Sequence, residues 1–340
     1  MHMRAIFAGT LALLAGMGGG ASVRAEDVAA FYAGKQVTFI IPTTVGGGFD
    51  LYSRTLMDTM RKYIPGHPTI VLQNMPGAGG VRAAGYMYNV APKDGSTFGM
   101  PLSNIPLAEA LDPTAAKDRS VGFSWIGTIT PETEVLAVWR KTGVATIEDS
   151  RHKELAIGAT GKLGTLALNA GLVKALLGSK FKIVLGYPAG NEVNLAMENG
   201  EVQGRTNQWT SWKSQRPEWI EKGMLNYLVQ IGPKEKELPQ VPSFLDLVKD
   251  PRDQAVVRLL QSNQLLGRSV YGPPGMPADK LAALREAFNQ TMRDADFIAR
   301  IKSLDLVVNP RSGADLQAEI AATMEHADAA ARDFKRLLHL

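Results

Sequence analysis

Two glycine-rich segments near the amino end contain the residues best placed to do chemistry. Residues 42–50 follow a run rich in Val and Ile, and residues 75–80 follow a second such run, so each segment stands between an expected strand and an expected helix. Glycine lets the backbone approach a ligand closely and adopt a positive φ. The N-terminus of a helix presents unpaired N–H groups and a partial positive charge. Two such turns side by side predict an anion-binding site that needs no arginine.

These glycines also have structural interpretations. Gly46, Gly47 and Gly48 could form a plain loop. Asp50 could cap the following helix, because its carboxylate can accept backbone N–H bonds. A dinucleotide fingerprint in the second segment would need glycine where Arg82 stands. We therefore do not expect a nucleotide at this site.

A third strand–turn–helix junction, at residues 159–165, contains Gly161 and Lys162. A phosphate-binding P-loop would need glycine where Ala156 stands and Ser or Thr where Leu163 stands. The P-loop motif therefore fails. The turn can still bind an anion through the N-terminus of its helix.

The residue patterns expected of catalytic or metal sites are missing. The sequence has no cysteine and no Gly-x-Ser-x-Gly nucleophile turn. His67, His152, His326 and His339 do not show the spacing of metal ligands. We therefore expect a protein that is not an enzyme, uses no cofactor or metal, and releases its ligand unaltered.

Short runs rich in Val and Ile alternate with helical stretches, which predicts an α/β fold with mainly parallel sheets. The expected strands are residues 37–41, 70–74, 136–139, 155–158, 181–185, 202–206, 225–231, 265–271 and 306–308. The expected helices are residues 51–64, 81–90, 106–111, 166–177, 191–199, 214–222, 278–294 and 314–339.

Residues 1–25 have the pattern of a secretory signal peptide. A short positive start precedes an apolar run at residues 5–17, and small residues follow at the usual cleavage positions. The run is shorter than the roughly 20 apolar residues of a membrane span; the alternative is an amphipathic or disordered start. We expect export, with Glu26 as the first mature residue. Loss of Arg4 and Arg24 would lower the formal charge from +4 to +2, which argues against nucleic acid as a partner.

The length of the chain suggests two domains, although no flexible linker separates them. Strands that cross between two lobes fit this pattern. The first crossing is expected near residues 125–139, and the return near residues 264–271. The expected boundaries are a signal peptide at 1–25, lobe 1 at 26–136 plus 266–340, and lobe 2 at 137–265.

Several of these segments resemble one protein family. Residues 42–50 are similar to the Pro-x-x-Pro-Gly-Gly-x-x-Asp loop of the TctC or Bug-type periplasmic substrate receptors of tripartite tricarboxylate transporters. Residues 74–80 match the Asn-x-Pro-Gly-Ala-Gly-Gly loop of the same family. Val45 departs from the pattern, because the family has proline there. Further similar segments are residues 91–95, 159–165 and 272–277.

The resemblance implies a two-lobed periplasmic binding protein of the type II, Venus-flytrap class. It implies a monomer that closes on a small organic carboxylate and delivers it to the membrane subunits of a transporter. The expected ligand-binding residues are Thr43, Thr44, Gly46, Gly47, Gly48, Asp50, Pro76, Gly77, Ala78, Gly79, Ser103, Asn104, Thr160, Gly164, Thr165, Tyr187, Ala189 and Trp209.

Some alternatives stay open at this point. Trp209 could line the pocket or hold a loop against the core. Arg205 stands where many family members have Asp, and it could bind a second carboxylate or form a surface or hinge salt bridge. The same cleft could serve a sensory receptor, or an enzyme acting on a carboxylate. The ligand could be a dicarboxylate, a tricarboxylate or an aromatic acid.

Overall fold

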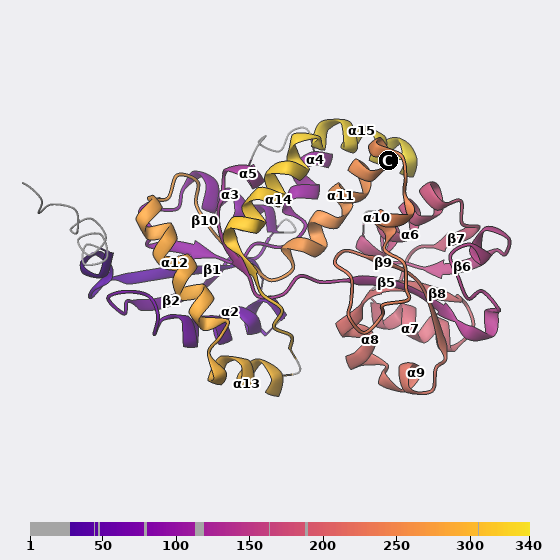
Figure 1. The fold of residues 1–340 in the computed structure, drawn as a ribbon, viewed down its shortest axis with the longest axis horizontal. Helices are drawn as coiled ribbons and strands as arrows, with labels where there is room; N and C mark the ends of the chain where they lie inside the picture. Colours follow the sequence, from indigo (N-terminus) through magenta and orange to yellow (C-terminus); the bar gives the residue numbers. More distant parts are fainter. Residues whose placement is uncertain are drawn as a thin grey trace, which may run out of the picture.

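The chain forms two separate β-sheets that lie in the two halves of an elongated molecule (Figure 1). The computed structural model describes residues 28–340 except 44, 47, 78, 79, 113–118, 163, 188, 189 and 305. The predicted signal peptide, residues 1–25, therefore lies wholly outside the described residues. Among the helices that are described, none combines the length and the apolar character that a membrane span requires.

The first sheet has the strand order β11-β4-β10-β3-β1-β2. β1 pairs in parallel with β2 and with β3, whereas β10 pairs antiparallel with β3 and β4, and β11 pairs antiparallel with β4. The strands are β1 Gln36–Ile41, β2 Thr69–Asn74, β3 Thr97–Gly99, β4 Ser124–Thr128, β10 Ser269–Gly272 and β11 Arg311–Ser312.

The second sheet has the order β7-β6-β8-β5-β9. β6 pairs in parallel with β7 and β8, and β5 pairs antiparallel with β8 and β9. Its strands are β5 Glu134–Trp139, β6 Leu155–Gly158, β7 Phe181–Val184, β8 Gly204–Gln208 and β9 Leu225–Ile231. The α/β class is confirmed, but each sheet is mixed rather than mainly parallel. The antiparallel pairs arise where the chain enters or leaves a sheet through a crossing.

Two crossing segments connect the sheets, as the sequence predicted. One joins β4 to β5 and the other leads from the helix at residues 251–266 into β10. They run side by side, because the Ile129 N–H donates to the Arg268 carbonyl at 2.9 Å and the Arg268 N–H donates to the Thr130 carbonyl at 3.0 Å. The Glu132 N–H donates to the Gln264 carbonyl at 2.8 Å. The lobe boundaries themselves stay a proposal.

The helices cover both faces of the sheets (Figure 1). Their bounds are α2 Gly48–Met60, α3 Val81–Asn89, α4 Ile105–Leu111, α5 Arg119–Gly122, α6 Thr165–Leu177, α7 Gly190–Glu198, α8 Trp209–Gln215, α9 Pro217–Glu221, α10 Phe244–Leu247, α11 Pro251–Leu266, α12 Ala278–Thr291, α13 Ala295–Ser303, α14 Gly313–Glu325 and α15 Ala327–Leu338. Short 3₁₀ turns lie at Arg140–Thr142 and Asp149–Arg151.

Helix α11 was missed by the sequence analysis, although its cap is well formed. The Asp250 carboxylate accepts hydrogen bonds from the backbone N–H groups of Arg252 and Asp253, which is the usual role of an N-cap residue. The last turns of α11 bury polar residues such as Gln261 and Asn263. Buried polar residues hide the apolar periodicity by which a helix is recognised.

Four further expectations are corrected. The strand expected at 265–271 begins only at Ser269, because α11 continues through Leu266. The strand expected at 306–308 is not formed, and the short β11 lies at Arg311–Ser312. The helices expected at 214–222 and 314–339 are each divided in two. The first divides before Pro217, which favours the first turn of a new helix; the second divides at His326.

The C-terminal helix α15 packs on elements that border the second sheet. Its buried residues include Ala331 and Phe334, and they share one core cluster with Leu168 of α6 and Leu260 of α11. The preceding helix, α14, packs on β4 of the first sheet. The end of the chain therefore passes from one half of the molecule to the other (Figure 1). We propose that a division into lobes by packing assigns α15 to lobe 2.

Candidate functional site

The described part of the first glycine turn is held by a network of hydrogen bonds around Asp50. The Asp50 carboxylate accepts a hydrogen bond from the Gly46 N–H at 3.0 Å and two hydrogen bonds from the Arg54 guanidinium, at 2.9 and 2.8 Å. The Asn74 amide donates to Asp50 at 2.9 Å and to the Thr43 carbonyl at 2.8 Å. Asp50 therefore ties the end of β1 to the end of β2, and it orders the turn with its own carboxylate buried.

The electrostatics of Asp50 follow from these partners. Its pKa is lowered to about 2, chiefly by the hydrogen bonds from Arg54, with further contributions from Asn74 and the Gly46 N–H. Burial acts in the opposite direction and raises the pKa. Asp50 is therefore a carboxylate at any physiological pH, and its charge is balanced within the loop.

The glycine turns use conformations that favour glycine. Gly46 has a φ of 92° and Gly80 has a φ of 89°, in the region that residues with a side chain rarely adopt. A Cβ on Gly80 would also lie 2.9 Å from the side chain of Leu102. Of the predicted ligand residues, Thr44, Gly47, Ala78, Gly79 and Ala189 lie outside the described residues.

An arginine that the sequence analysis missed lies next to the first turn. The guanidinium of Arg268 lies 2.9 Å from a Glu132 carboxylate oxygen and 4.1 Å from the ring centre of Phe49. A Cβ on Gly48 would lie 3.8 Å from its Nη2 atom. The Arg268 Nε is buried without a hydrogen-bond partner among the described residues. Arg268 and Glu132 belong to the two crossing segments, so this charged pair lies between the lobes.

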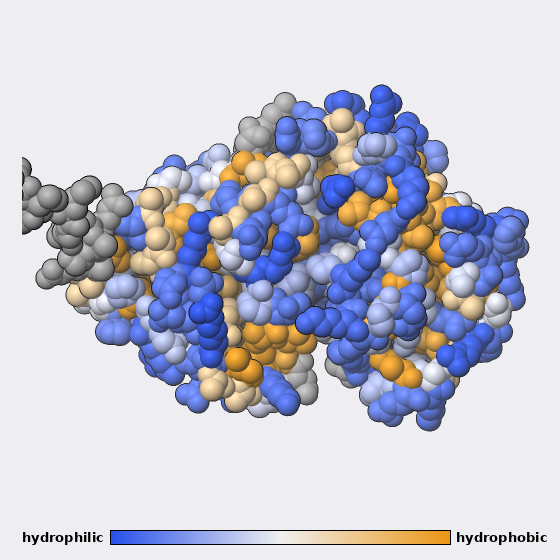
Figure 2. All heavy atoms as spheres, in the orientation of Figure 1, coloured by the Kyte–Doolittle hydropathy of each residue, from blue (hydrophilic) through white to orange (hydrophobic). Residues whose placement is uncertain are grey.

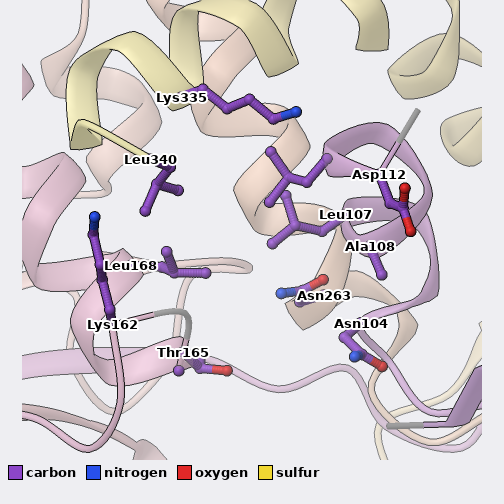
Figure 3. Close-up of a pocket in the computed structure, with 12 residues that line it drawn as sticks. Asn104, Leu107, Ala108, Asp112, Lys162, Thr165, Leu168, Asn263, Lys335 and Leu340 are labelled. Atoms are coloured by element: carbon purple, nitrogen blue, oxygen red, sulfur yellow. The ribbon is translucent and has the colours of Figure 1, made fainter. Parts of the chain in front are cut away.

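A cavity of about 640 Å³ lies between the two halves, beside α4 and α6 (Figure 3). Figure 2 also shows a notch between the two halves at its lower edge, on the side of α2 and α8 rather than on the side of α4 and α15, which border this cavity. The cavity is lined by Asn104, Leu107, Ala108, Leu111, Asp112, Lys162, Gly164, Thr165, Leu168, Asn263, Lys335 and Leu340. It thus brings together Asn104, which follows β3, and Gly164 and Thr165, which follow β6.

The N-terminus of α6 forms one side of this cavity. Gly164 is its N-cap in an extended conformation, with φ −72° and ψ 149°, and no side chain caps the helix. A Cβ on Gly164 would lie 2.5 Å from the Thr160 hydroxyl oxygen, so the tight turn requires glycine for lack of space. Free N–H groups at the start of a helix attract anions.

Asn263 of α11 lines the same cavity, and one polar atom of its side chain has no hydrogen-bond partner among the described residues. The side chain is 8% exposed, and this atom is Oδ1. Buried polar groups are normally hydrogen-bonded, to protein or to water. The unpartnered atom is a carbonyl oxygen, which accepts hydrogen bonds, so a donor such as water would satisfy it and a carboxylate would not.

Comparisons with known proteins support the architecture. No protein-family model matches the chain. A curated relative is the UPF0065 protein in the gbd 5′ region of Cupriavidus necator, which is 25% identical over 297 residues, or 84% of this chain and 83% of that protein.

Solved structures give a clearer match to the fold. A TctC solute-binding protein from Polaromonas, solved without ligand, has a TM-score of 0.69 at 16% identity and covers 89% of this chain and 99% of its own. This chain has the fold of a TctC-type solute-binding protein. The structure of Rpa4515 from R. palustris with adipate has a TM-score of 0.58 at 18% identity, over 90% and 97% of the two chains. MatC from Rhodopseudomonas palustris with bound malate has a TM-score of 0.57 at 20% identity, over 87% and 99%.

The resemblance to the TctC and Bug-type receptors is thus confirmed at the level of the fold. Within this TctC-type fold, Gly46, Gly48 and Gly77 are exposed at the glycine turns. None of these glycines lines the cavity of Figure 3. The same holds for the half-buried Thr43, Pro76, Ser103 and Thr160. Their contact with a ligand stays a prediction.

Trp209 is bound within its own lobe. Its indole N–H donates to a Glu237 carboxylate oxygen at 2.6 Å, and its ring packs edge-on against Tyr227. The side chain is buried and holds the loop at residues 233–242 against the core. This is the second of the two roles that the sequence left open for Trp209, the first being a place in the pocket lining. Tyr187 is half-buried, and its hydroxyl lies 3.4 Å from a Glu201 oxygen.

Arg205 is buried rather than placed in a surface salt bridge. Its guanidinium donates to Asn194 at 2.8 Å, to Asn207 at 3.1 Å and to the carbonyl of Gly190, the first residue of α7. Burial lowers its pKa to about 10, and the nearby Glu134 opposes this shift. Arg205 therefore positions the N-terminus of α7 instead of lining the described cavity.

Replacement of Asp50 tests the network at the first turn. Asp50→Asn is expected to lower the free energy of unfolding at pH 7 by about 2 kcal/mol, because hydrogen bonds to charged groups contribute roughly 1.5–3 kcal/mol. The lowered pKa stabilises the native state fully above about pH 4, and this contribution is lost as the pH falls towards 2. Urea denaturation of both proteins at several pH values measures the difference.

Asp58→Asn, on the exposed side of α2, serves as the control and should change stability by less than about 0.5 kcal/mol. A difference between wild type and Asp50→Asn that stays constant from pH 7 to pH 2.5 would contradict the assigned role.

Proposed function

We propose that this protein is a periplasmic receptor that captures a small organic carboxylate between its two lobes and releases it unaltered. The observation that carries the proposal is the cavity in which the uncapped N-terminus of α6 and Asn104 come from opposite halves of the molecule. This arrangement offers N–H donors from one lobe and a side-chain amide from the other. Closure of the lobes would bring both onto one anion.

The energetics of such a site are sufficient for useful affinity. A carboxylate loses its hydration on entry and needs donors in return. Interaction with a helix N-terminus contributes typically 0.3–1 kcal/mol, and up to about 2 kcal/mol where partly buried. Hydrogen bonds to a charged group add roughly 1.5–3 kcal/mol each. A few such contacts support micromolar binding, which corresponds to about −8 kcal/mol.

The described residues of the glycine turns do not line this cavity, and we propose them as further contacts that closure of the lobes would bring to the ligand. Arg268 extends this set with a positive charge beside Gly48. Glu132 balances this charge in the unliganded arrangement. A ligand carboxylate at the first turn would compete with Glu132 for Arg268, which would couple binding to the crossing segments.

The similar proteins support the ligand class and the cellular role. Rpa4515 was solved with adipate and MatC with malate, both small carboxylates. On the strength of the TctC-type fold, we propose that this receptor acts as a monomer in the periplasm and delivers its ligand to a tripartite tricarboxylate-type transporter. Because a ligand shifts an equilibrium only by its preference for one state, contacts from both lobes would favour the closed form.

Thr165→Pro tests whether the backbone of α6 binds the carboxylate. Thr165 is the first residue of α6, where proline fits well and removes only an N–H group. The extended Gly164 before it is also compatible with a following proline. We expect normal thermal stability and a loss of affinity of about tenfold or more for the bound acid, measured by calorimetry.

The matched control is Thr165→Ala, which removes the side chain and keeps the N–H group. It should lose less affinity than Thr165→Pro. Equal affinity of the proline variant and wild type would show that this N–H group does not contact the ligand.

Arg268→Met tests the charge at the first turn. It should weaken carboxylate binding about tenfold, because a charge-assisted contact is lost. The double variant Arg268→Met/Glu132→Gln keeps the local charge balanced and should bind as weakly as the single variant. Arg293→Met, at an exposed position on the surface, should bind like wild type. Wild-type affinity in Arg268→Met would remove this residue from the site.

A further inference from the structure

One glutamate is buried where the first crossing segment enters the second sheet. Glu134 is the first residue of β5 (Figure 1). Its side chain is 5% exposed, and its Oε2 has no hydrogen-bond partner among the described residues. Its backbone is fixed between two strands, opposite Gln208 of β8 and Ile231 of β9. The carboxyl group is therefore held in the hinge, away from solvent.

A second glutamate lies two residues earlier on the same crossing segment. The Glu132 carboxylate lies 2.9 Å from the Arg268 guanidinium and accepts a hydrogen bond from the side-chain amide of Gln208. Gln208 is also the strand partner of Glu134. The hinge thus contains two neighbouring carboxyl groups, of which only Glu132 has an ion-pair partner among the described residues.

The surroundings of Glu134 favour its protonated form. A buried carboxylate loses its hydration, so the group takes up a proton where no partner replaces the water. Burial raises the pKa of Glu134 to about 7, and the negative charge of Glu132 adds to this shift. Arg205 opposes it, but the Arg205 guanidinium donates to Asn194 and to the Gly190 carbonyl. Near neutral pH, Glu134 is therefore divided between its neutral and charged forms.

The other charged side chains on the elements around Glu134 do not face it as free charges. β5 packs on α6 and α11 in one core cluster, and the charges that act on the pKa of Glu134 are those of Glu132 and Arg205. The remaining ones are the exposed Lys174, Lys236, Arg252 and Arg258, the half-buried Glu235, Asp253 at the far end of α11, and the pairs Lys213 with Glu237 and Lys234 with Asp246.

We infer that Glu134 is a proton-binding site in the hinge, and that the receptor takes up a proton there when it binds its acid. This inference rests on the proposed function and names a regulation of the same site. A ligand carboxylate at Arg268 would compete with Glu132 for the guanidinium and would leave two negative charges near Glu134. Such charges favour protonation of a neighbouring carboxyl group. By reciprocity, the proton strengthens the binding of the acid by the same factor.

The stability of the ligand-free protein tests whether Glu134 holds a proton. Glu134→Gln keeps the shape of the neutral carboxyl group and cannot ionise. Because the pKa of Glu134 is raised in the folded protein, its stabilising contribution is full below the ordinary value of 4.5 and is lost as the pH rises to about 7. Relative to the variant, the unfolding equilibrium constant of the wild type should rise about tenfold per pH unit in that window. Urea denaturation at several pH values measures it.

Calorimetry tests the coupling to the ligand. The full-length protein is titrated at about pH 7.5 with adipate and with malate, whose carboxylates are fully ionised there. The difference in binding enthalpy between phosphate and Tris buffers gives the number of protons taken up. We expect about half a proton per ligand for the wild type and none for Glu134→Gln. From about pH 6.5 to about 9, the affinity should fall about tenfold in the wild type and less than twofold in the variant.

Glu148→Gln, an exposed position in the same half of the molecule, is the matched control and should keep the proton uptake of the wild type. If Glu134→Gln fails to fold, infrared spectroscopy of the wild type replaces it. The absorption band of a protonated carboxylic acid should then grow when adipate or malate is added at about pH 7.5.

The outcomes separate this inference from the proposed function. Binding of either acid without proton uptake, or equal uptake by Glu134→Gln and the wild type, would overturn the inference and leave the carboxylate receptor intact. A difference in stability between these two proteins that does not change with pH would overturn it as well. Failure of every carboxylate to bind the wild-type protein would overturn both proposals together.

Discussion

The backbone hydrogen bonds between the two crossing segments are the constraint on which the rest of the structure depends. They join residues 129–132 to residues 264–268, and they fix where one sheet ends relative to the other. Each half has hydrophobic clusters of its own on its sheet, so a change at the crossings would move the lobes as bodies, in the manner of a hinge. Because the crossings set this geometry, Asn104 and Thr165 face one cavity although they follow strands of different sheets.

Two buried charged side chains, Asp50 and Arg205, each fix a loop through several hydrogen bonds. Asp50 orders the first glycine turn through Arg54 and Asn74, and Arg205 holds the start of α7 through Asn194 and the carbonyl of Gly190. A buried charge is costly unless its hydrogen bonds are satisfied. Here those bonds fix the backbone at the first glycine turn and at the start of α7. In the proposed receptor such ordering would lower the entropy lost on binding, because the donors would need no rearrangement when the anion arrives.

Helix N-termini recognise a carboxylate but not the molecule that carries it. Backbone N–H groups are the same in every protein of this fold, so the identity of the ligand must be decided elsewhere in the cavity. In the proposed receptor this role falls to side chains that line the cavity, such as Leu107 and Leu168. Relatives with one fold can then take different acids by changing the cavity walls and keeping the turns.

The sequence by itself determined the α/β class, the three strand–glycine–helix junctions and the two crossings, because each depends on local periodicity and on the backbone freedom of glycine. It missed α11, whose buried polar residues do not follow an apolar pattern. It also missed Arg268, Asn263 and Lys335, since their place beside the glycine turn or in the cavity arises from contacts between distant parts of the chain. Only the tertiary structure decided that Arg205 is buried and that α15 packs on the second half. The burial of a residue and the charges around it depend on contacts between distant parts of the chain. A short window of sequence does not contain that information.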